Sequence, residues 1–147
     1  MMIPDKVSLS ESDVVQSQAE NARQTCVLLA EDDPALRRFL EIVLQRAGYH
    51  VIPASDGLQA LKVVLSTPID VVITDAMMPN LSGDEFCGFI RNSETLAHLP
   101  VILLSGLGQR ESNENSKLAD AFLSKPVSVE SLVTCIDELL ARKKSDG

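Results

Sequence analysis

Residues 27–41 are VLLAEDDPALRRFLE, and this stretch decides the predicted fold. The apolar run Cys26–Ala30 is too short for a buried helix and is typical of an interior strand. Three acidic residues follow it. Helical spacing then begins at Pro34, a favourable first residue of a helix, and stops at Gly48. The stretch therefore predicts a strand, an acidic loop and a helix over Pro34–Ala47.

The same alternation of strand and helix patterns continues along the chain. The predicted strands are His50–Pro53, Ile69–Thr74, Val101–Leu104 and Ala121–Leu123, and the predicted helices are Leu58–Ser66, Asp84–Asn92 and Ser128–Arg142. A further helix over Gln109–Lys117 is weakly specified, because that segment has no apolar residue. This alternation predicts an α/β fold: a doubly wound, five-stranded parallel sheet with helices on both faces.

The composition is typical of one globular domain. The chain has 147 residues, of which 45% are hydrophobic and 23% are charged. Residues 1–24 are polar and show no sustained apolar period, so we interpret them as a flexible tail, with a short helix weakly indicated near Asp13–Ala22. Residues 25–142 form the predicted domain, and residues 143–147 form a short C-terminal tail.

The charge of the chain limits the classes of partner. The net charge of −8 argues against direct binding to nucleic acid or to anionic membrane surfaces, because both require a basic surface. The sequence shows no secretory signal and no apolar run of membrane-spanning length. We therefore expect a cytoplasmic protein whose partners are other proteins.

Polar or charged side chains follow four of the five predicted strands. Glu31, Asp32 and Asp33 follow the first strand, Asp75 follows the third, Ser105 the fourth and Lys125 the fifth. The carboxyl ends of parallel strands meet at one edge of a sheet, where ligands bind in folds of this kind. Carboxylates gathered there repel one another and need compensation from a cation, from protonation of one acid or from Lys125. The sequence therefore predicts an acidic site beside Lys125, and a hard divalent ion such as Mg²⁺ suits such an all-oxygen site.

Asp75 is the strongest candidate for a nucleophile at this edge. A carboxylate can attack phosphorus and form an acyl phosphate, and phosphoryl transfer depends mainly on positioning and charge neutralisation. Taken singly, each residue has an ordinary structural alternative: Asp33 as a helix cap, Asp75 as a loop residue, Ser105 as a strand-end hydroxyl and Lys125 as a solvated lysine. Their occurrence at successive strand ends favours one common site.

Five segments resemble the receiver domain of bacterial two-component signalling, of the chemotaxis-regulator-like type with a flavodoxin-like fold. They are VLLAEDDPALRRFLE, GYHVIPASDGLQAL, DVVITDAMMPNLSGDEF, PVILLSG and AFLSKPVS, and they span about residues 25–142. The resemblance implies that Asp32 and Asp33 bind Mg²⁺, with Asp75 and the backbone carbonyl of Met77 as further ligands. It also implies that Asp75 accepts a phosphoryl group from a histidine kinase or a histidine phosphotransfer protein.

The resemblance further assigns roles to residues near the ends of the last two strands. It implies that Ser105 is the switch hydroxyl, that Lys125 binds the phosphoryl group and that the Lys125–Pro126 peptide bond is cis. Phe122 matches the aromatic switch position of the family, with a plain core aromatic as the alternative. A downstream partner protein is then expected to bind the surface of the fourth helix, Gln109–Lys117, and the fifth strand, Ala121–Leu123, and homodimerisation stays open.

The expected function is therefore a phosphoryl-accepting signalling switch and not an enzyme. An aspartyl phosphatase is disfavoured, because Met77 lies where such enzymes usually have a second, general-acid Asp. The remaining alternative is a non-phosphorylated interaction module, which the full set of acidic residues, Ser105 and Lys125 disfavours. In the family that the chain resembles, the residues two positions after the phosphoacceptor and two positions after the switch hydroxyl influence hydrolysis. Here they are Met77 and Leu107, and neither can orient an attacking water by a strong hydrogen bond, so we expect slow autodephosphorylation.

Overall fold

The computed structural model of the chain describes residues 24–106 and 117–146. The helix indicated near Asp13–Ala22 lies outside the described residues. The weakly specified segment Gln109–Lys117 is described only at Lys117, and Leu107 also lies outside. The expectations for these segments therefore stay predictions.

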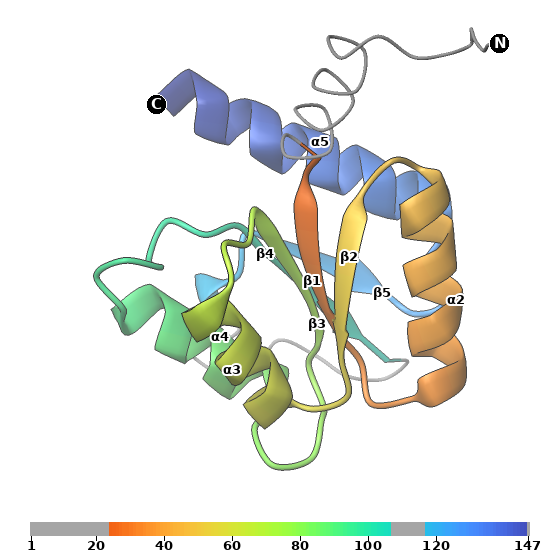
Figure 1. Cartoon of the computed structure of the whole chain (residues 1–147), viewed down its shortest axis with the longest axis horizontal. Helices are drawn as coiled ribbons and strands as arrows, with labels where there is room; N and C mark the ends of the chain where they lie inside the picture. Colours follow the sequence, from red (N-terminus) through yellow and green to blue (C-terminus); the bar gives the residue numbers. More distant parts are fainter. Residues whose placement is uncertain (1–23, 107–116, 147) are drawn as a thin grey trace, which may run out of the picture.

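Five strands form one parallel sheet in the order β2-β1-β3-β4-β5 (Figure 1). The strands are β1 (Cys26–Ala30), β2 (His50–Ala54), β3 (Val71–Asp75), β4 (Val101–Ser105) and β5 (Ala121–Ser124). Their order reverses direction after β1, because β2 lies on one side of β1 and β3 lies on the other. The predicted doubly wound parallel sheet is confirmed, and ligands in such sheets bind beyond the carboxyl ends of the strands at this reversal.

Helices cover both faces of the sheet, as predicted. Helices α2 (Pro34–Arg46) and α5 (Val129–Asp146) pack on one face, and α3 (Gly57–Ser66) and α4 (Gly83–Asn92) pack on the other. Successive β1 side chains alternate between the two apolar cores: Val27 and Leu29 face α2 and α5, and Leu28 faces α3 and α4. Strands buried on both faces explain why the sequence shows continuous apolar runs.

The ends of two helices add detail to the prediction. The α5 helix runs to Asp146, so residues assigned by sequence to a C-terminal tail continue the helix. Helix α4 begins with a capping box in which the side chains of Ser82 and Glu85 each accept a hydrogen bond from the other residue's backbone N–H.

Within residues 24–106 and 117–146, no helix has the length and apolar character needed to cross a membrane.

Candidate functional site

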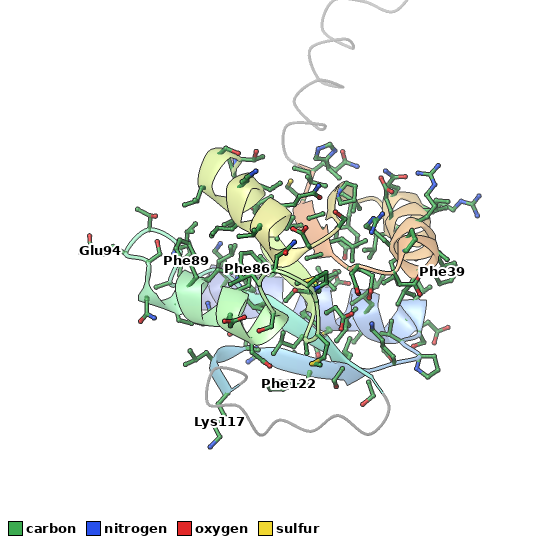
Figure 2. The ribbon with its side chains drawn as sticks, turned by 90° about the horizontal axis from the view of Figure 1, so that it is seen from below. Phe39, Phe86, Phe89, Glu94, Lys117 and Phe122 are labelled. Atoms are coloured by element: carbon green, nitrogen blue, oxygen red, sulfur yellow. The ribbon has the colours of Figure 1, made fainter. Side chains whose placement is uncertain are left out.

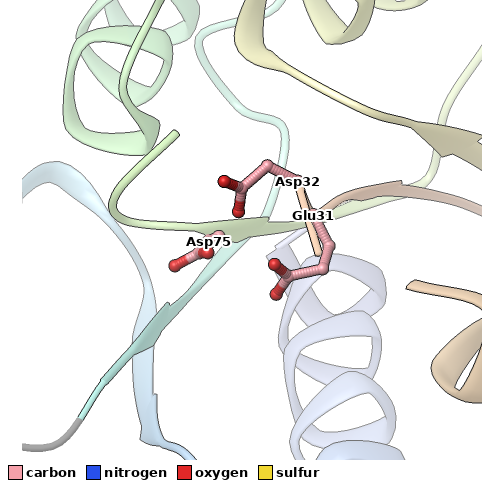
Figure 3. Close-up of side chains that lie close together, drawn as sticks. All are labelled: Glu31, Asp32 and Asp75. Atoms are coloured by element: carbon pink, nitrogen blue, oxygen red, sulfur yellow. The ribbon is translucent and has the colours of Figure 1, made fainter. Parts of the chain in front are cut away.

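Three carboxylates converge where β1 and β3 end (Figure 3). These strands pair directly, with Ala30 opposite Thr74, so the residues that follow them come together. Glu31, Asp32 and Asp75 each contribute a carboxylate oxygen, and these oxygens all lie within 4.8 Å of one another. Glu31 is fully buried and Asp75 is 5% exposed, whereas Asp32 is exposed. The cluster therefore opens to solvent on the side of Asp32.

Lys125 lies against the two buried acids of this cluster. Its Nζ is 2.9 Å from Oε1 of Glu31 and 2.9 Å from Oδ2 of Asp75. Burial alone lowers the pKa of Lys125, but its bonds to Asp75 and Glu31 outweigh burial, and the pKa of Lys125 is raised overall. The lysine is therefore charged and neutralises part of the cluster.

Burial also changes the pKa of Glu31. The loss of hydration raises the pKa of Glu31, and the charge of Asp75 raises it further, although the backbone N–H of Asp33 and Lys125 favour the ionised form. That N–H donates to Oε2 of Glu31 at 3.0 Å. With the three acids ionised, one ammonium leaves two negative charges uncompensated, which favours a divalent cation at this place.

Asp33 caps the helix that follows it, and its role as a Mg²⁺ ligand stays a prediction. Its side chain accepts a hydrogen bond from the backbone N–H of Ala35 at 3.0 Å and caps α2, immediately before Pro34. Among the described residues, the cluster of three carboxylates contains Glu31 and does not contain Asp33. The structural alternative for Asp33, a helix cap, is therefore what the geometry favours. The signal for Glu31 was its position directly after a buried strand.

Ser105 and Phe122 lie on the strands next to Asp75. Ser105 ends β4, and Asp75 pairs with its neighbour Leu104, so Ser105 reaches the same edge of the sheet as Asp75. The carbonyl of Ser105 accepts a hydrogen bond from the backbone N–H of Lys125 at 2.7 Å. Phe122 is half-buried on the edge strand β5 (Figure 2). The Lys125–Pro126 bond is cis, as the resemblance implied.

Met77 lies in the loop that follows Asp75. Its backbone N–H donates to Oδ1 of Asp75 at 3.3 Å, and its side chain is 62% exposed. An apolar side chain at this position offers no general acid.

The donor set of the cluster consists only of oxygen atoms. Hard cations such as Mg²⁺ bind carboxylate and carbonyl oxygens and usually retain several waters, which an exposed Asp32 beside two buried acids would allow. The residues therefore fit Mg²⁺. Oδ2 of Asp75 accepts a hydrogen bond from Lys125, and a carboxylate is a group that can react with an electrophilic phosphoryl group.

Comparison with known proteins identifies a family that covers most of the chain. The family model of the response regulator receiver domain matches residues 27–137. The chain is 32% identical over 141 residues to hybrid signal transduction histidine kinase D of Dictyostelium discoideum, covering 93% of this chain and 9% of the kinase. It is 33% identical over 118 residues to the DNA-binding dual master transcriptional regulator RpaA of a Synechocystis strain, covering 79% of this chain and 49% of that protein.

A solved structure shows the same likeness. The response regulator protein TrrA of Thermotoga maritima, determined in complex with Mg²⁺-BeF, superposes with a TM-score of 0.73 at 32% identity. The match covers 80% of this chain and 100% of TrrA. The chain thus spans a whole solved receiver-like structure but less than half of the first curated relatives it matches.

Proposed function

The chain belongs to the response regulator receiver domain family of two-component signalling, and from this premise we propose that Asp75 accepts a phosphoryl group in a Mg²⁺-dependent reaction. The observation that supports this most directly is the placement of the Asp75 carboxylate. It contacts a charged lysine and lies within 4.8 Å of two further acids, at the edge of the sheet where ligands bind.

The metal site of the proposal combines side chains and backbone. Asp32 and Asp75 are the proposed carboxylate ligands and the backbone carbonyl of Met77 a further ligand, with Glu31 beside them in place of the sequence-predicted Asp33. When bound, Mg²⁺ would neutralise charge on the phosphoryl oxygens and on the acids. The solved structure of the relative TrrA, a complex with Mg²⁺-BeF, is consistent with such a site.

The chemical step uses the side chains that already contact Asp75. A carboxylate oxygen of Asp75 forms a bond to phosphorus while the bond from phosphorus to the donor histidine nitrogen breaks. The donor ring, protonated on its other nitrogen, keeps the electron pair of the broken bond and leaves as a neutral imidazole. Lys125, now bonded to Oδ2 of Asp75 at 2.9 Å, can then donate to a phosphoryl oxygen. The Ser105 hydroxyl, on the adjacent strand, is the proposed second donor.

The proposed output is a change in partner affinity. Receiver domains interact with histidine kinases or phosphotransfer proteins, and we expect such a donor in the cytoplasm for this chain. A phosphoryl group adds charge and acceptor oxygens at Asp75, which would draw Ser105 inward and allow half-buried Phe122 to move. A downstream protein that prefers this state would bind near β5. The chain is then a switch without turnover.

The test is phosphorylation by a small phosphodonor. The protein is incubated with acetyl phosphate, with Mg²⁺ or with a chelator, and its intact mass is measured. We expect a gain of one phosphoryl group that requires Mg²⁺ and is lost in Asp75→Asn. No gain would indicate an interaction module, and steady release of phosphate over many turnovers would indicate a phosphatase; either result contradicts the proposal.

A further inference from the structure

The loop that follows Asp75 is fixed by contacts with α3, a helix that contributes no residue to the acidic cluster. This β3–α4 loop, residues 76–82, includes Met77, whose carbonyl is a proposed Mg²⁺ ligand. The loop and the N-terminus of α3 lie side by side beyond the carboxyl ends of the strands (Figure 1). The position of the Met77 carbonyl therefore depends on how the loop is attached there.

The loop and α3 touch backbone to backbone. A Cβ atom placed on Gly57, the first residue of α3, would lie 2.0 Å from the carbonyl oxygen of Leu81 in the loop. At Gly83, the first residue after the loop, a Cβ atom would lie 2.1 Å from the carbonyl oxygen of Asp75. Both positions need glycine because a side chain would collide with the facing backbone carbonyl. The loop therefore packs closely against α3 at one end and against Asp75 at the other.

A side-chain hydrogen bond also connects the same loop to the residue that precedes α3. Nδ2 of Asn80 donates to Oδ2 of Asp56 at 2.9 Å. The other oxygen of Asp56 accepts from the backbone N–H of Gln59 at 2.8 Å and caps α3. Asn80 has a φ of 73°, the left-handed region that most residues avoid but Asn tolerates. One carboxylate thus joins the start of α3 to the turn of the loop.

We propose that Asn80, Asp56 and Gly57 are positioning residues of the Mg²⁺ site: through them the N-terminus of α3 fixes the loop so that the Met77 carbonyl faces Asp75 and Asp32. This inference rests on the proposed function. None of the three residues needs to touch the metal. Freed from α3, the loop would occupy several conformations, and the apparent affinity for Mg²⁺ would fall by the fraction that remains competent.

The test measures Mg²⁺ affinity directly, by isothermal titration of MgCl₂ into the purified full chain. We expect Asn80→Ala to raise the dissociation constant by about three- to tenfold, because it removes a hydrogen bond to a charged acceptor and disfavours the positive φ. Asn80→Gly removes the same hydrogen bond but accepts the backbone conformation, so we expect a smaller rise of about threefold. Gly57→Ala should have the largest effect.

A matched control separates positioning from general stability. In Gln24→Ala, a side-chain amide hydrogen bond of 2.9 Å to the carbonyl of Gly48 is lost from the opposite end of β1. Melting of each variant without Mg²⁺ reports its stability, and we expect only the loop variants to change the dissociation constant.

Unchanged affinity in Asn80→Gly would overturn the role of the Asp56–Asn80 hydrogen bond, and a lower melting temperature with unchanged affinity would make Asn80 merely structural. Failure of the proposed function would look different, because the wild-type protein itself would then take up no Mg²⁺. If Gly57→Ala does not fold, the two Asn80 variants still decide the matter.

Discussion

Replacement of Asp32 by Asn is expected to stabilise the metal-free protein and to abolish its stabilisation by Mg²⁺. Asp32 is the exposed member of the cluster, and its carboxylate lies within 4.8 Å of those of Glu31 and Asp75. Lys125 contacts the other two acids, and no contact between Lys125 and Asp32 is formed within 4.0 Å among the described residues. Asp32 therefore adds mainly repulsion until a cation binds.

The size of the effect is set by the geometry. Two unit charges at this separation repel by about 3.5 kcal/mol at an effective dielectric constant of about 20. Water and salt around the exposed Asp32 reduce each of its two repulsions to about 1 kcal/mol or less. We expect Asp32→Asn to raise the free energy of unfolding by about 1–2 kcal/mol, which is about 2–8 °C in melting temperature for a domain of this size.

The assay is thermal unfolding monitored by circular dichroism, with a chelator and with saturating Mg²⁺. Binding at about one hundred times the dissociation constant should stabilise the wild-type protein by about 2.7 kcal/mol, and Asp32→Asn should lose most of this gain. The matched control is Asp33→Asn, which removes the neighbouring charge but keeps an oxygen that can cap α2. The reasoning is refuted if Asp33→Asn loses the response to Mg²⁺ and Asp32→Asn retains it.

Two further predictions concern the phosphoryl lifetime and the pH dependence of stability. Met77→Asn combined with Leu107→Glu should speed autodephosphorylation, because both new side chains can bond an attacking water; loss of the phosphoryl mass with time measures it, and an unchanged rate would reject the idea. The Tyr49 hydroxyl donates to Oδ1 of Asp137 at 2.9 Å, and burial together with that carboxylate raises the pKa of Tyr49 to about 12. Tyr49→Phe should therefore cost about 1 kcal/mol of unfolding free energy at neutral pH. Because the pKa of Tyr49 in the folded protein lies above its ordinary value of 10.0, this contribution is complete below pH 10.0 and disappears as pH rises through about 12. Urea unfolding across this pH range should show the unfolding free energies of the wild-type protein and Tyr49→Phe converging.

Much of the site was predictable because parallel strands place their carboxyl ends at one edge of a sheet. Short apolar runs located the strands, and the residues after them, Asp75 and Lys125 above all, were expected to meet. The structure brings these two within 2.9 Å although 50 positions separate them. Local patterns sufficed here because the fold repeats one simple unit.

The acidic residues after β1 were harder to assign. Glu31, Asp32 and Asp33 are consecutive, and in a turn the direction of each side chain depends on backbone angles and contacts that the sequence pattern does not contain. Pro34 offered a local clue, since an Asp before it is suited to cap a helix, and Asp33 does so. The position of Glu31 directly after a buried strand indicated the edge of the sheet, but not its contact with Lys125, which comes from a distant strand end.

The sequence alone determined the strand and helix alternation, the parallel sheet and the edge at which its reactive groups lie, since these depend on local apolar periodicity and chain direction. Only the tertiary structure decided which acids lie near Asp75, that Lys125 bridges Glu31 and Asp75, and that α3 contacts the loop carrying Met77. Those outcomes depend on close contacts between segments distant in the chain, where differences of one residue or a few ångströms change which atoms meet.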